Sequence, residues 1–536
     1  MIINAEDKKR FFFLFIVISL AVSLPLIYHT LTQLSGLPFL LNLDDGYIHA
    51  RLAQNLAQTG HSGLNPGETG GGSSSLPWTL LLAGCSLAGI AADKAAWFMS
   101  LFTWALTAWA GALLSYKLFG NSVKSWIAAI AIALSGQLAM SALSGMETHL
   151  FLFLIIMSIY FHAQQRLWIS AYWCAFAAVT RPEALMLAIA FFMVEFIKIL
   201  KYDNKESSKR ILKAGFRFTL TPIAVLISIA LLALLSGEMP GTLAARRWLI
   251  GMPPTPWENI SLSAKGASIL INQLIDRVIN LVGPGHGIGV IWALVIVFLA
   301  VAGSFIHSKP SIKVIALYLF FHFLFFLIFL PITGHHGRYF APLWALAPLL
   351  VVNGWSYLGS RLKNFQFQKL SPYLAAILIA GYVPQIFKWG RFHFDTVDHL
   401  TRIHLRMAQT VNSSIPGNET IGVFDIGLMS WTVQNRIIDL GGLTSNHILN
   451  RLHNGNVTNV LNENDVEYLV LPEYDGPNRW VLVRRLNINP NDLQMIERFS
   501  LGNKVMPHLS ATMVALPALG LHKRKPNESG EVQPVR

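Results

Sequence analysis

The sequence predicts a polytopic α-helical membrane protein with a small α/β domain at its C-terminal end. The chain has 536 residues, of which 53% are hydrophobic and only 13% are charged. Its apolar residues recur in blocks of roughly twenty, the length that a helix needs to span a bilayer. From Lys388 onward the pattern changes to short strand-like and helical segments.

Charge and cysteine content narrow the class further. The formal net charge is +13, and many Lys and Arg residues lie in short loops between apolar blocks. The positive-inside rule explains cations in such loops, so a nucleic-acid partner is not expected. Both cysteines, Cys85 and Cys174, fall in apolar segments, which argues against a disulfide framework or a cysteine metal cluster.

The apolar blocks define the expected helices of the membrane domain. They cover residues 11–28, 76–92, 95–118, 125–143, 149–163, 167–179, 183–200, 216–235, 288–306, 314–331, 339–358 and 372–387. The first block is expected to remain as an uncleaved span, because no small-residue cleavage site follows it cleanly.

The basic loops set the expected topology. Clusters of Lys and Arg at residues 8–10, 117–124, 198–213, 309–313 and 361–369 should face the cytoplasm. If every block crossed, the N-terminus and the loop 198–213 would lie on opposite faces. Block 76–92 contains Gly84 and Gly89 and follows a polar loop, so we expect it to lie in the interface or re-enter from outside. About eleven crossings of the inner (plasma) membrane remain.

This topology gives a domain plan. We expect a transmembrane domain over residues 1–390, an extracytoplasmic α/β domain over 391–521 and a disordered tail over 522–536. Within the first, segments 41–92 and 237–287 should form the main outer loops. In the α/β domain, a helix is expected over 398–414 and strands over 419–424, 436–440, 466–471 and 480–483.

The adjacent carboxylates Asp44 and Asp45 are the candidate catalytic residues, at the start of the first outer loop. Like charges at close range push their pKa values apart, and a raised pKa suits a general base. Two alternatives stay open. One carboxylate caps a helix over residues 48–58, or the pair holds a divalent cation.

The glycine-rich stretch GETGGGSSS, residues 67–75, offers backbone amides and hydroxyls for a phosphate or a sugar. Ser73 and Ser74 are therefore expected to contact substrate, as is Tyr47, which lies two residues after Asp45. The alternative is a flexible linker. No lysine follows as in a P-loop, which disfavours nucleotide hydrolysis.

Ionisable residues also lie at the outer ends of expected helices. Glu147, Arg181 and Glu183 either contact substrate or pair with one another as structural ion pairs.

Other cations gather on the same face. The turn TGHHGRY contributes His335, His336 and Arg338, and the segment 237–287 contributes Arg246, Arg247 and Lys265. Because outer cations break the positive-inside pattern, and because arginine binds phosphate through a bidentate fork, we expect a phosphate-binding role for Arg338, Arg181, Arg246, Arg247, His335 and His336.

Several short motifs carry a family resemblance, in this order: DDGYIHARLAQNLAQTG from Asp44, GLNPGE, SSSLPWTLLLAG, GMET, TRPE, EMPGT, GRYFAP and IIDLGGLT, which ends at Thr444. Together they resemble the multi-spanning GT-C glycosyltransferases, and most closely the arabinofuranosyltransferase-like group that uses polyprenyl-phosphate sugars. Gly46 departs from the alanine usual in that group.

The resemblance implies a membrane transferase with its active site at the outer face. It implies a polyprenyl-phosphate sugar donor and a glycan, glycolipid or protein acceptor of the cell envelope. Asp44 or Asp45 would remove the acceptor proton while cations stabilise the leaving lipid phosphate. The main rival is a transporter or flippase of a lipid-linked sugar. A sensory or structural protein with a sugar-binding outer domain is a third possibility.

Overall fold

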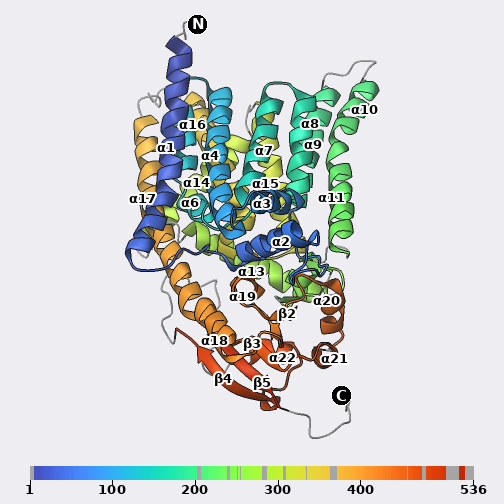
Figure 1. Cartoon of the computed structure of the whole chain (residues 1–536). Coiled ribbons are helices and arrows are strands. Elements are labelled where there is room, and N and C mark those ends of the chain that lie inside the picture. Colours follow the sequence, from blue (N-terminus) through green and yellow to red (C-terminus); the bar gives the residue numbers. More distant parts are fainter. Residues whose placement is uncertain are drawn as a thin grey trace.

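A bundle of long apolar helices stands on a smaller mixed domain, and shorter helices lie between them (Figure 1). The computed structural model describes residues 5–201, 207–237, 242–249, 251–253, 255–279, 287–305, 309–332, 335–361, 371–455, 457–473, 479–501 and 518–525. The N-terminal end of α1 lies at the end of the bundle away from the C-terminal domain (Figure 1).

The bundle helices follow the expected apolar blocks, except that α10 forms mostly within the expected basic loop 198–213. They are α1 (Ala5–Leu34), α4 (Ala92–Phe119), α5 (Val123–Ala133), α6 (Gly136–Ser141), α7 (Thr148–Ala163), α8 (Leu167–Thr180), α9 (Leu185–Lys201), α10 (Ser207–Phe218), α11 (Leu220–Ser236), α14 (Gly287–Phe305), α15 (Pro310–Phe329), α16 (Ala341–Arg361) and α17 (Ser371–His399). The expected single helix over 125–143 is divided into α5 and α6. At this break, Gly136 lies against α17, where a Cβ would be 2.8 Å from the carbonyl oxygen of Gln385.

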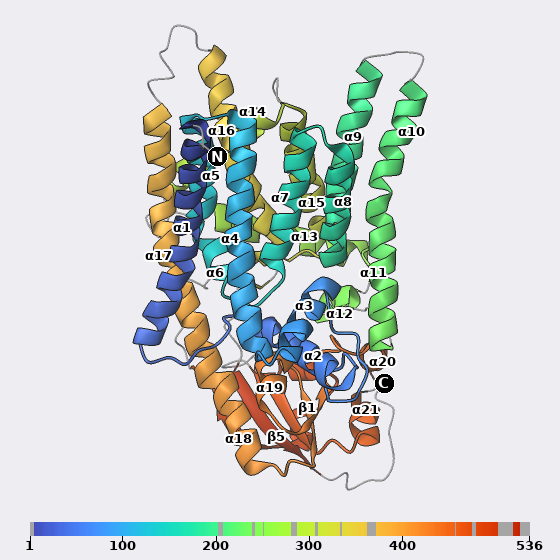
Figure 2. The same cartoon turned by 45° about the horizontal axis from the view of Figure 1, so that its top comes forward.

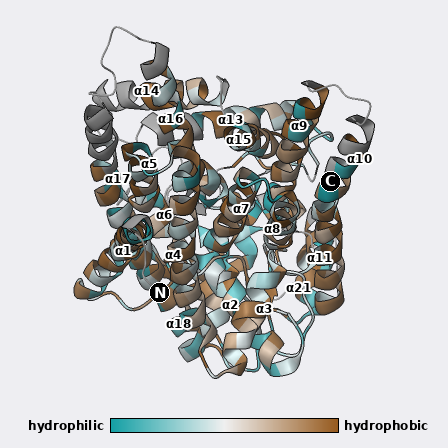
Figure 3. Ribbon diagram, turned by 90° about the horizontal axis from the view of Figure 1, so that it is seen from above, coloured by the Kyte–Doolittle hydropathy of each residue, from teal (hydrophilic) through white to brown (hydrophobic). Residues whose placement is uncertain are grey.

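Within the described residues, five helices are long and apolar enough to cross a membrane by length and composition: Asp7–Leu34, Ala92–Phe119, Ile211–Ser236, Pro310–Phe329 and His336–Leu358. Shorter apolar helices accompany them, including Val123–Ala133, Thr148–Ala163 and Leu167–Thr180. Seen along the bundle, a hydrophilic region lies near its middle beside α7 and α8, and hydrophobic surfaces face outward (Figure 3).

Helices α2 (Asp44–Thr59) and α3 (Leu76–Leu87) form the layer between the bundle and the C-terminal domain (Figures 1 and 2). At 1.5 Å per residue, α3 is about 18 Å long, too short for a hydrocarbon core of about 30 Å. It buries Trp78 and Leu82 and exposes Leu80, Leu81 and Leu87. The interfacial or re-entrant position expected for block 76–92 stays a prediction.

The segment 237–287 contributes α12 (Thr242–Leu249) and α13 (Ile260–Ile279), and a short helical turn, η3 (His335–Phe340), precedes α16. The start of the EMPGT motif, residues 238–241, lies outside the described residues. A second short turn, η1 (Pro182–Ala184), joins α8 to α9.

Helix α17 runs out of the bundle and enters the C-terminal domain (Figure 2). It continues through a π-helical turn, η5 (Leu400–Leu405), into α18 (Arg406–Ser414). The expected helix over 398–414 is therefore the end of one continuous connection between the two parts of the molecule.

The C-terminal domain is a five-stranded sheet with the strand order β2-β1-β3-β5-β4. Strand β1 (Thr420–Val423) pairs in parallel with β2 (Arg436–Asp439) and with β3 (Tyr468–Glu473), whereas β5 (Ala518–Arg524) is antiparallel to β3 and β4 (Leu493–Phe499). Its helices and turns are α19 (Ile426–Thr432), α20 (Asn446–His453), α21 (Val457–Glu463), α22 (Val481–Arg485) and η7 (Pro490–Asp492).

Two expectations for this domain are wrong. The apolar run at 480–483 forms α22 instead of a strand. The expected tail, 522–536, begins too early, because β5 continues to Arg524 and His522 bonds to the buried carboxylate of Glu473 at 2.7 Å. Residues 526–536 lie outside the described residues. An internal ion pair thus accounts for His522, the first residue of the expected tail.

A close glycine contact joins α14 and α16. A Cβ on Gly354 would meet the carbonyl oxygen of Leu299, and one on Gly303 would meet that of Leu350. Small residues let membrane helices approach in this way.

We expect Gly354→Ala to lower the free energy of unfolding by about 1–3 kcal/mol, because the added methyl group forces two helix backbones apart. The apparent Tm of the detergent-solubilised protein measures this. Gly84→Ala on α3 is the matched control, since a Cβ there meets nothing within 4 Å. Equal Tm values for the two variants would contradict the contact.

Candidate functional site

Asp45 lies in the first turn of α2, between two arginines from distant parts of the chain. Its Oδ2 accepts hydrogen bonds from Nη2 of Arg246 at 2.9 Å and from Nη2 of Arg338 at 2.7 Å. Arg246 comes from α12 and Arg338 from η3, so three elements meet at this carboxylate. Asp45 and Arg338 are 8% and 5% exposed. Charge-assisted hydrogen bonds of this kind are the strong ones in proteins.

Tyr339 provides the aromatic surface under these cations. Among the described residues, the guanidinium carbons of Arg181, Arg246 and Arg338 lie 5.2, 6.0 and 5.4 Å from the centre of its ring. A ring face attracts cations at such distances, more so when water is excluded. The ring therefore helps to hold three like charges in one small volume.

Arg181 carries a second group of charges. It donates from Nη1 to Glu147 at 3.0 Å and from Nη2 to Glu183 at 2.7 Å. These are the mutual ion pairs that the sequence allowed as the alternative to substrate contact.

His49 connects the two groups. It follows Asp45 by four residues on α2, so both side chains lie on one helix face. Its Nε2 is 3.7 Å from Oε2 of Glu147 and 3.3 Å from the hydroxyl of Ser74. Burial lowers the pKa of His49, which favours the neutral ring, although Glu147 opposes this.

The sequence did not single out His49 or Tyr339. The spacing of His49 from Asp45 was the available signal for the first, and Tyr339 was visible only as the neighbour of Arg338.

Asp44 has a different environment from Asp45. Its two carboxylate oxygens accept the backbone N–H groups of Gly427 and Leu428 at 2.8 and 2.7 Å. Asp44 thus caps α19 of the C-terminal domain, not the helix on which it lies. A Cβ on Gly427 would collide with the Asp44 carboxylate, so this approach requires glycine.

Asp44 also belongs to a buried titratable cluster. Burial raises its pKa to about 6, and the nearby His404 opposes the shift. Burial disfavours the charged form of His404 as well, yet its hydrogen bond to Asp425 and the Asp44 carboxylate together raise its pKa. The His404 Nε2 lies 3.7 Å from Asp425. The cluster lies where η5 joins the bundle to the domain.

The remaining expected site residues have other partners. Arg247 donates to the carbonyls of Pro253 and Phe329, both at 2.6 Å, and so fastens α12 to the end of α15. The Tyr47 hydroxyl accepts the N–H of Leu41 at 2.9 Å. The His336 ring packs edge-on against Phe392. The side chain of His335 lies outside the described residues.

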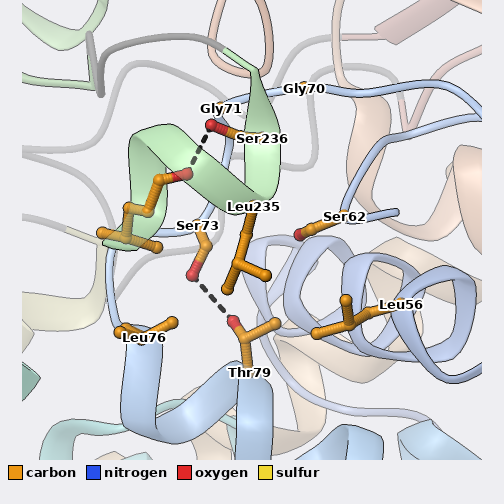
Figure 4. A pocket seen from close by; sticks show the side chains of 10 residues that line it. Leu56, Ser62, Gly70, Gly71, Ser73, Leu76, Thr79, Leu235 and Ser236 are labelled. Atoms are coloured by element: carbon orange, nitrogen blue, oxygen red, sulfur yellow. Dashed lines mark hydrogen bonds between the residues drawn. The ribbon is translucent and has the colours of Figure 1, made fainter. Parts of the chain in front are cut away.

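Ser73 lines a pocket beside the site (Figure 4). The pocket lies between α2, α3, the end of α11 and the glycine-rich loop, and its volume of about 10 Å³ has room for little more than a water molecule. Three of its hydroxyls already have partners: Ser73 bonds to Thr79 at 2.7 Å, and Ser236 donates to the carbonyl of Leu232 at 2.7 Å. Leucines make up much of the lining, so the pocket is a separate, largely apolar hollow.

A metal site has no ready-made ligand set among the described residues, where no group of three or more His, Cys, Asp or Glu side chains is arranged to hold an ion. Asp44 and Asp45 point to different partners, α19 and the two arginines. The divalent cation that the sequence left open stays an untested alternative.

Arg338 has two N–H donor groups that the described residues do not use. Its Nε and Nη1 are buried, and neither forms a hydrogen bond within the described part of the chain. A buried cation with two unused N–H groups costs free energy unless a ligand accepts them. A phosphate has the charge and the oxygens to do so.

Fold and site together define a polytopic membrane protein with a buried cluster of arginines and carboxylates at one end of its bundle. The solved structures show which fold this is. The chain matches ArnT from Cupriavidus metallidurans bound to undecaprenyl phosphate, with a TM-score of 0.54 and 11% identity over 94% of this chain and 97% of that one. It matches the apo state of the same protein with a TM-score of 0.51 and 12% identity, over 93% and 97% of the two chains.

ArnT is a GT-C glycosyltransferase, so the chain has the GT-C fold. Such low identity speaks to the fold alone, and the arabinofuranosyltransferase-like group stays a prediction. No protein among the curated sequences matches the chain. A family model described as a domain of unknown function (DUF8728) matches residues 395–509, which lie in the C-terminal domain.

We call the contact of the Asp44 carboxylate with the N–H groups of Gly427 and Leu428 the Asp44 clamp. We expect it to make the free energy of unfolding depend on pH. Because the pKa of Asp44 rises from 3.8 to about 6 on burial, the folded chain binds a proton there more tightly than the unfolded chain does. Its contribution to the free energy of unfolding therefore falls as pH rises from about 4 to about 6. Asp44→Asn should flatten this part of the profile, measured as apparent Tm in detergent across that range. An unchanged pH profile in the variant would rule the clamp out as the cause.

Proposed function

We propose that the chain is a membrane glycosyltransferase that transfers a sugar from a polyprenyl-phosphate donor to an envelope glycan, glycolipid or protein at the extracytoplasmic face. The observation that carries this is the buried carboxylate of Asp45 between Arg246 and Arg338, with two N–H groups of Arg338 unused. The fold of a protein solved with undecaprenyl phosphate supports the same reading.

The donor phosphate would bind at Arg338 and Arg246. Arg338 offers Nε and Nη1 directly, whereas Arg246 would exchange its bond to Asp45 for one to phosphate. Arg181 is already paired with two carboxylates, so its contribution is the weaker one. The cations then stabilise the charge that develops on the leaving phosphate.

Asp45 is the better placed of the two carboxylates to act as general base, since Asp44 is fully engaged by α19. Donor binding would draw the arginines from Asp45 to the phosphate. A carboxylate that loses cationic neighbours binds a proton more tightly, so the base becomes stronger when the donor is in place.

The transfer step is a displacement at the anomeric carbon. The acceptor oxygen forms the new bond to that carbon as the bond to the phosphate oxygen breaks, and polyprenyl phosphate leaves with the electron pair. The acceptor proton passes to Asp45. His49 and Ser74 lie close enough to the charged groups to bind sugar hydroxyls.

We expect Asp45→Asn to reduce transfer at least about a hundredfold, the range for loss of a general base. Glycan analysis of a deletion strain complemented with each variant measures this. Asp398→Asn, which removes a partner of the half-exposed Arg402, is the matched control and should behave as wild type. Full transfer by Asp45→Asn would exclude the base. Altered lipid-donor distribution with no sugar transferred by wild type would favour a flippase instead.

We expect Arg338→Lys to weaken binding of undecaprenyl phosphate about tenfold or more, because lysine keeps the charge but loses the planar fork. Native mass spectrometry of the purified protein measures the change. Arg402→Lys, at an exposed ion pair, is the control. Undiminished binding by Arg338→Lys would remove this arginine from the phosphate site.

A further inference from the structure

The C-terminal domain binds the outer loop, residues 60–75 between α2 and α3, through its strand β2. Asn65 binds the edge strand β2 through two hydrogen bonds, accepting from the N–H of Ile437 at 2.8 Å and donating to its carbonyl at 2.9 Å. The side-chain amide of Asn65 thus continues the hydrogen-bond ladder at the open edge of the sheet. Glu68 adds an ion pair with Arg436 at 2.6 Å.

A second attachment follows where the loop becomes glycine-rich. The N–H of Gly71 donates to the carbonyl of Thr444 at 2.7 Å. A Cβ on Gly72 would lie 2.6 Å from Cγ2 of Thr444, and one on Gly70 would lie 2.9 Å from the Thr444 carbonyl oxygen. The three glycines therefore let the loop backbone pack closely against Thr444, which a flexible linker would not require.

Thr444 itself is held rigidly. The Asp439 carboxylate, 1% exposed, accepts the N–H of Gly441 at 2.8 Å and both the N–H and the hydroxyl of Thr444, at 2.8 and 2.9 Å. Burial raises the pKa of Asp439, and these bonds oppose the shift. The IIDLGGLT motif thus forms the turn that directs the Thr444 carbonyl toward the N–H of Gly71.

The attached segment leads directly into the site. Ser74, three residues after Gly71, lies 3.3 Å from His49. At the other end, the Asp44 clamp holds the first turn of α2, which carries Asp45. Both ends of the unit that bears Asp45, His49 and Ser74 are thus fastened to the C-terminal domain.

We propose that the C-terminal domain is a positioning domain, in which Thr444, Asp439 and the N-terminus of α19 hold the outer loop and α2 against the arginines of the bundle. This gives the segment matched by a domain of unknown function a role in the reaction. This inference rests on the proposed function, because one of its tests measures sugar transfer.

A second-site rescue tests the proposal. Gly72→Ala should push the loop from Thr444 and reduce transfer to about a tenth of wild type or less, since a displacement of about 1 Å can cost a hundredfold. Thr444→Ser removes Cγ2 but keeps the hydroxyl that bonds to Asp439, so alone it should stay near wild type. The double variant should recover most of the transfer, because the methyl group that clashes is gone. Gly84→Ala is the glycine control.

Two further measurements separate positioning from unfolding. Undecaprenyl phosphate binding should be unchanged in Gly72→Ala, and amide exchange of the Gly71 region should rise in that variant and fall again in the double variant. Asn65→Ser, which removes the side-chain amide that bonds to β2, should raise the same exchange and lower transfer. Wild-type transfer by Gly72→Ala, or no rescue by Thr444→Ser in a folded double variant, would overturn the proposal.

The outcomes also separate this proposal from the function on which it rests. If wild type transfers no sugar, the proposed function fails, while the exchange data still report whether the domain fixes the loop. If wild type transfers sugar and exchange at Gly71 is as fast as in Gly72→Ala, the positioning role fails and the function stands.

Discussion

The structure depends on compensation of charges that are buried together at the junction of bundle and domain. Asp45, Glu147 and Glu183 face Arg181, Arg246 and Arg338, and removal of one partner would leave an uncompensated buried charge. The six groups come from α2, α12, η1, η3, the turn before α7 and the junction of α8 with η1, where Arg181 lies, so none of these elements can leave its place without breaking an ion pair. The same arrangement explains why Arg246 and Arg338 lie together with carboxylates at the end of the bundle next to the C-terminal domain.

Topology was the part most open to prediction from the sequence, because the bilayer imposes both helix length and charge bias. For block 76–92, parity of the basic loops predicts one block that does not cross, and α3 covers only Leu76–Leu87 of it; the crossing pattern itself stays a prediction. Side-chain partners were not open to prediction in the same way. Asp45 binds arginines about 200 and 290 positions away in the chain. His49 could be recognised as part of the site only from its contacts with Glu147 and Ser74 in the folded chain.

The errors in the C-terminal domain have a common physical cause. Strand β5 pairs between β3 and β4, so its register is set by partners distant in sequence and not by its own alternation. Its residue His522 lies against the fully buried Glu473, with Arg479 and Arg498 bound to the same carboxylate. The charged residues of 522–536, considered without these partners, predicted a disordered tail. The apolar residues at 480–483 likewise fit a short helix, α22, as well as a strand, since so few residues do not distinguish the two periods.

The acidic pair shows how two identical neighbours acquire different roles. Successive residues at the start of a helix point about 100° apart, so one carboxylate faces the bundle and the other the C-terminal domain. Asp45 meets mobile side-chain cations that a phosphate can compete for, whereas Asp44 meets fixed backbone N–H groups that no ligand can draw away. The sequence allowed a capping role for one of the two, and the structure assigns it to Asp44 on a different helix, α19. Because this cap holds the first turn of the helix that bears Asp45, Asp44 sets the position of the carboxylate proposed as the general base.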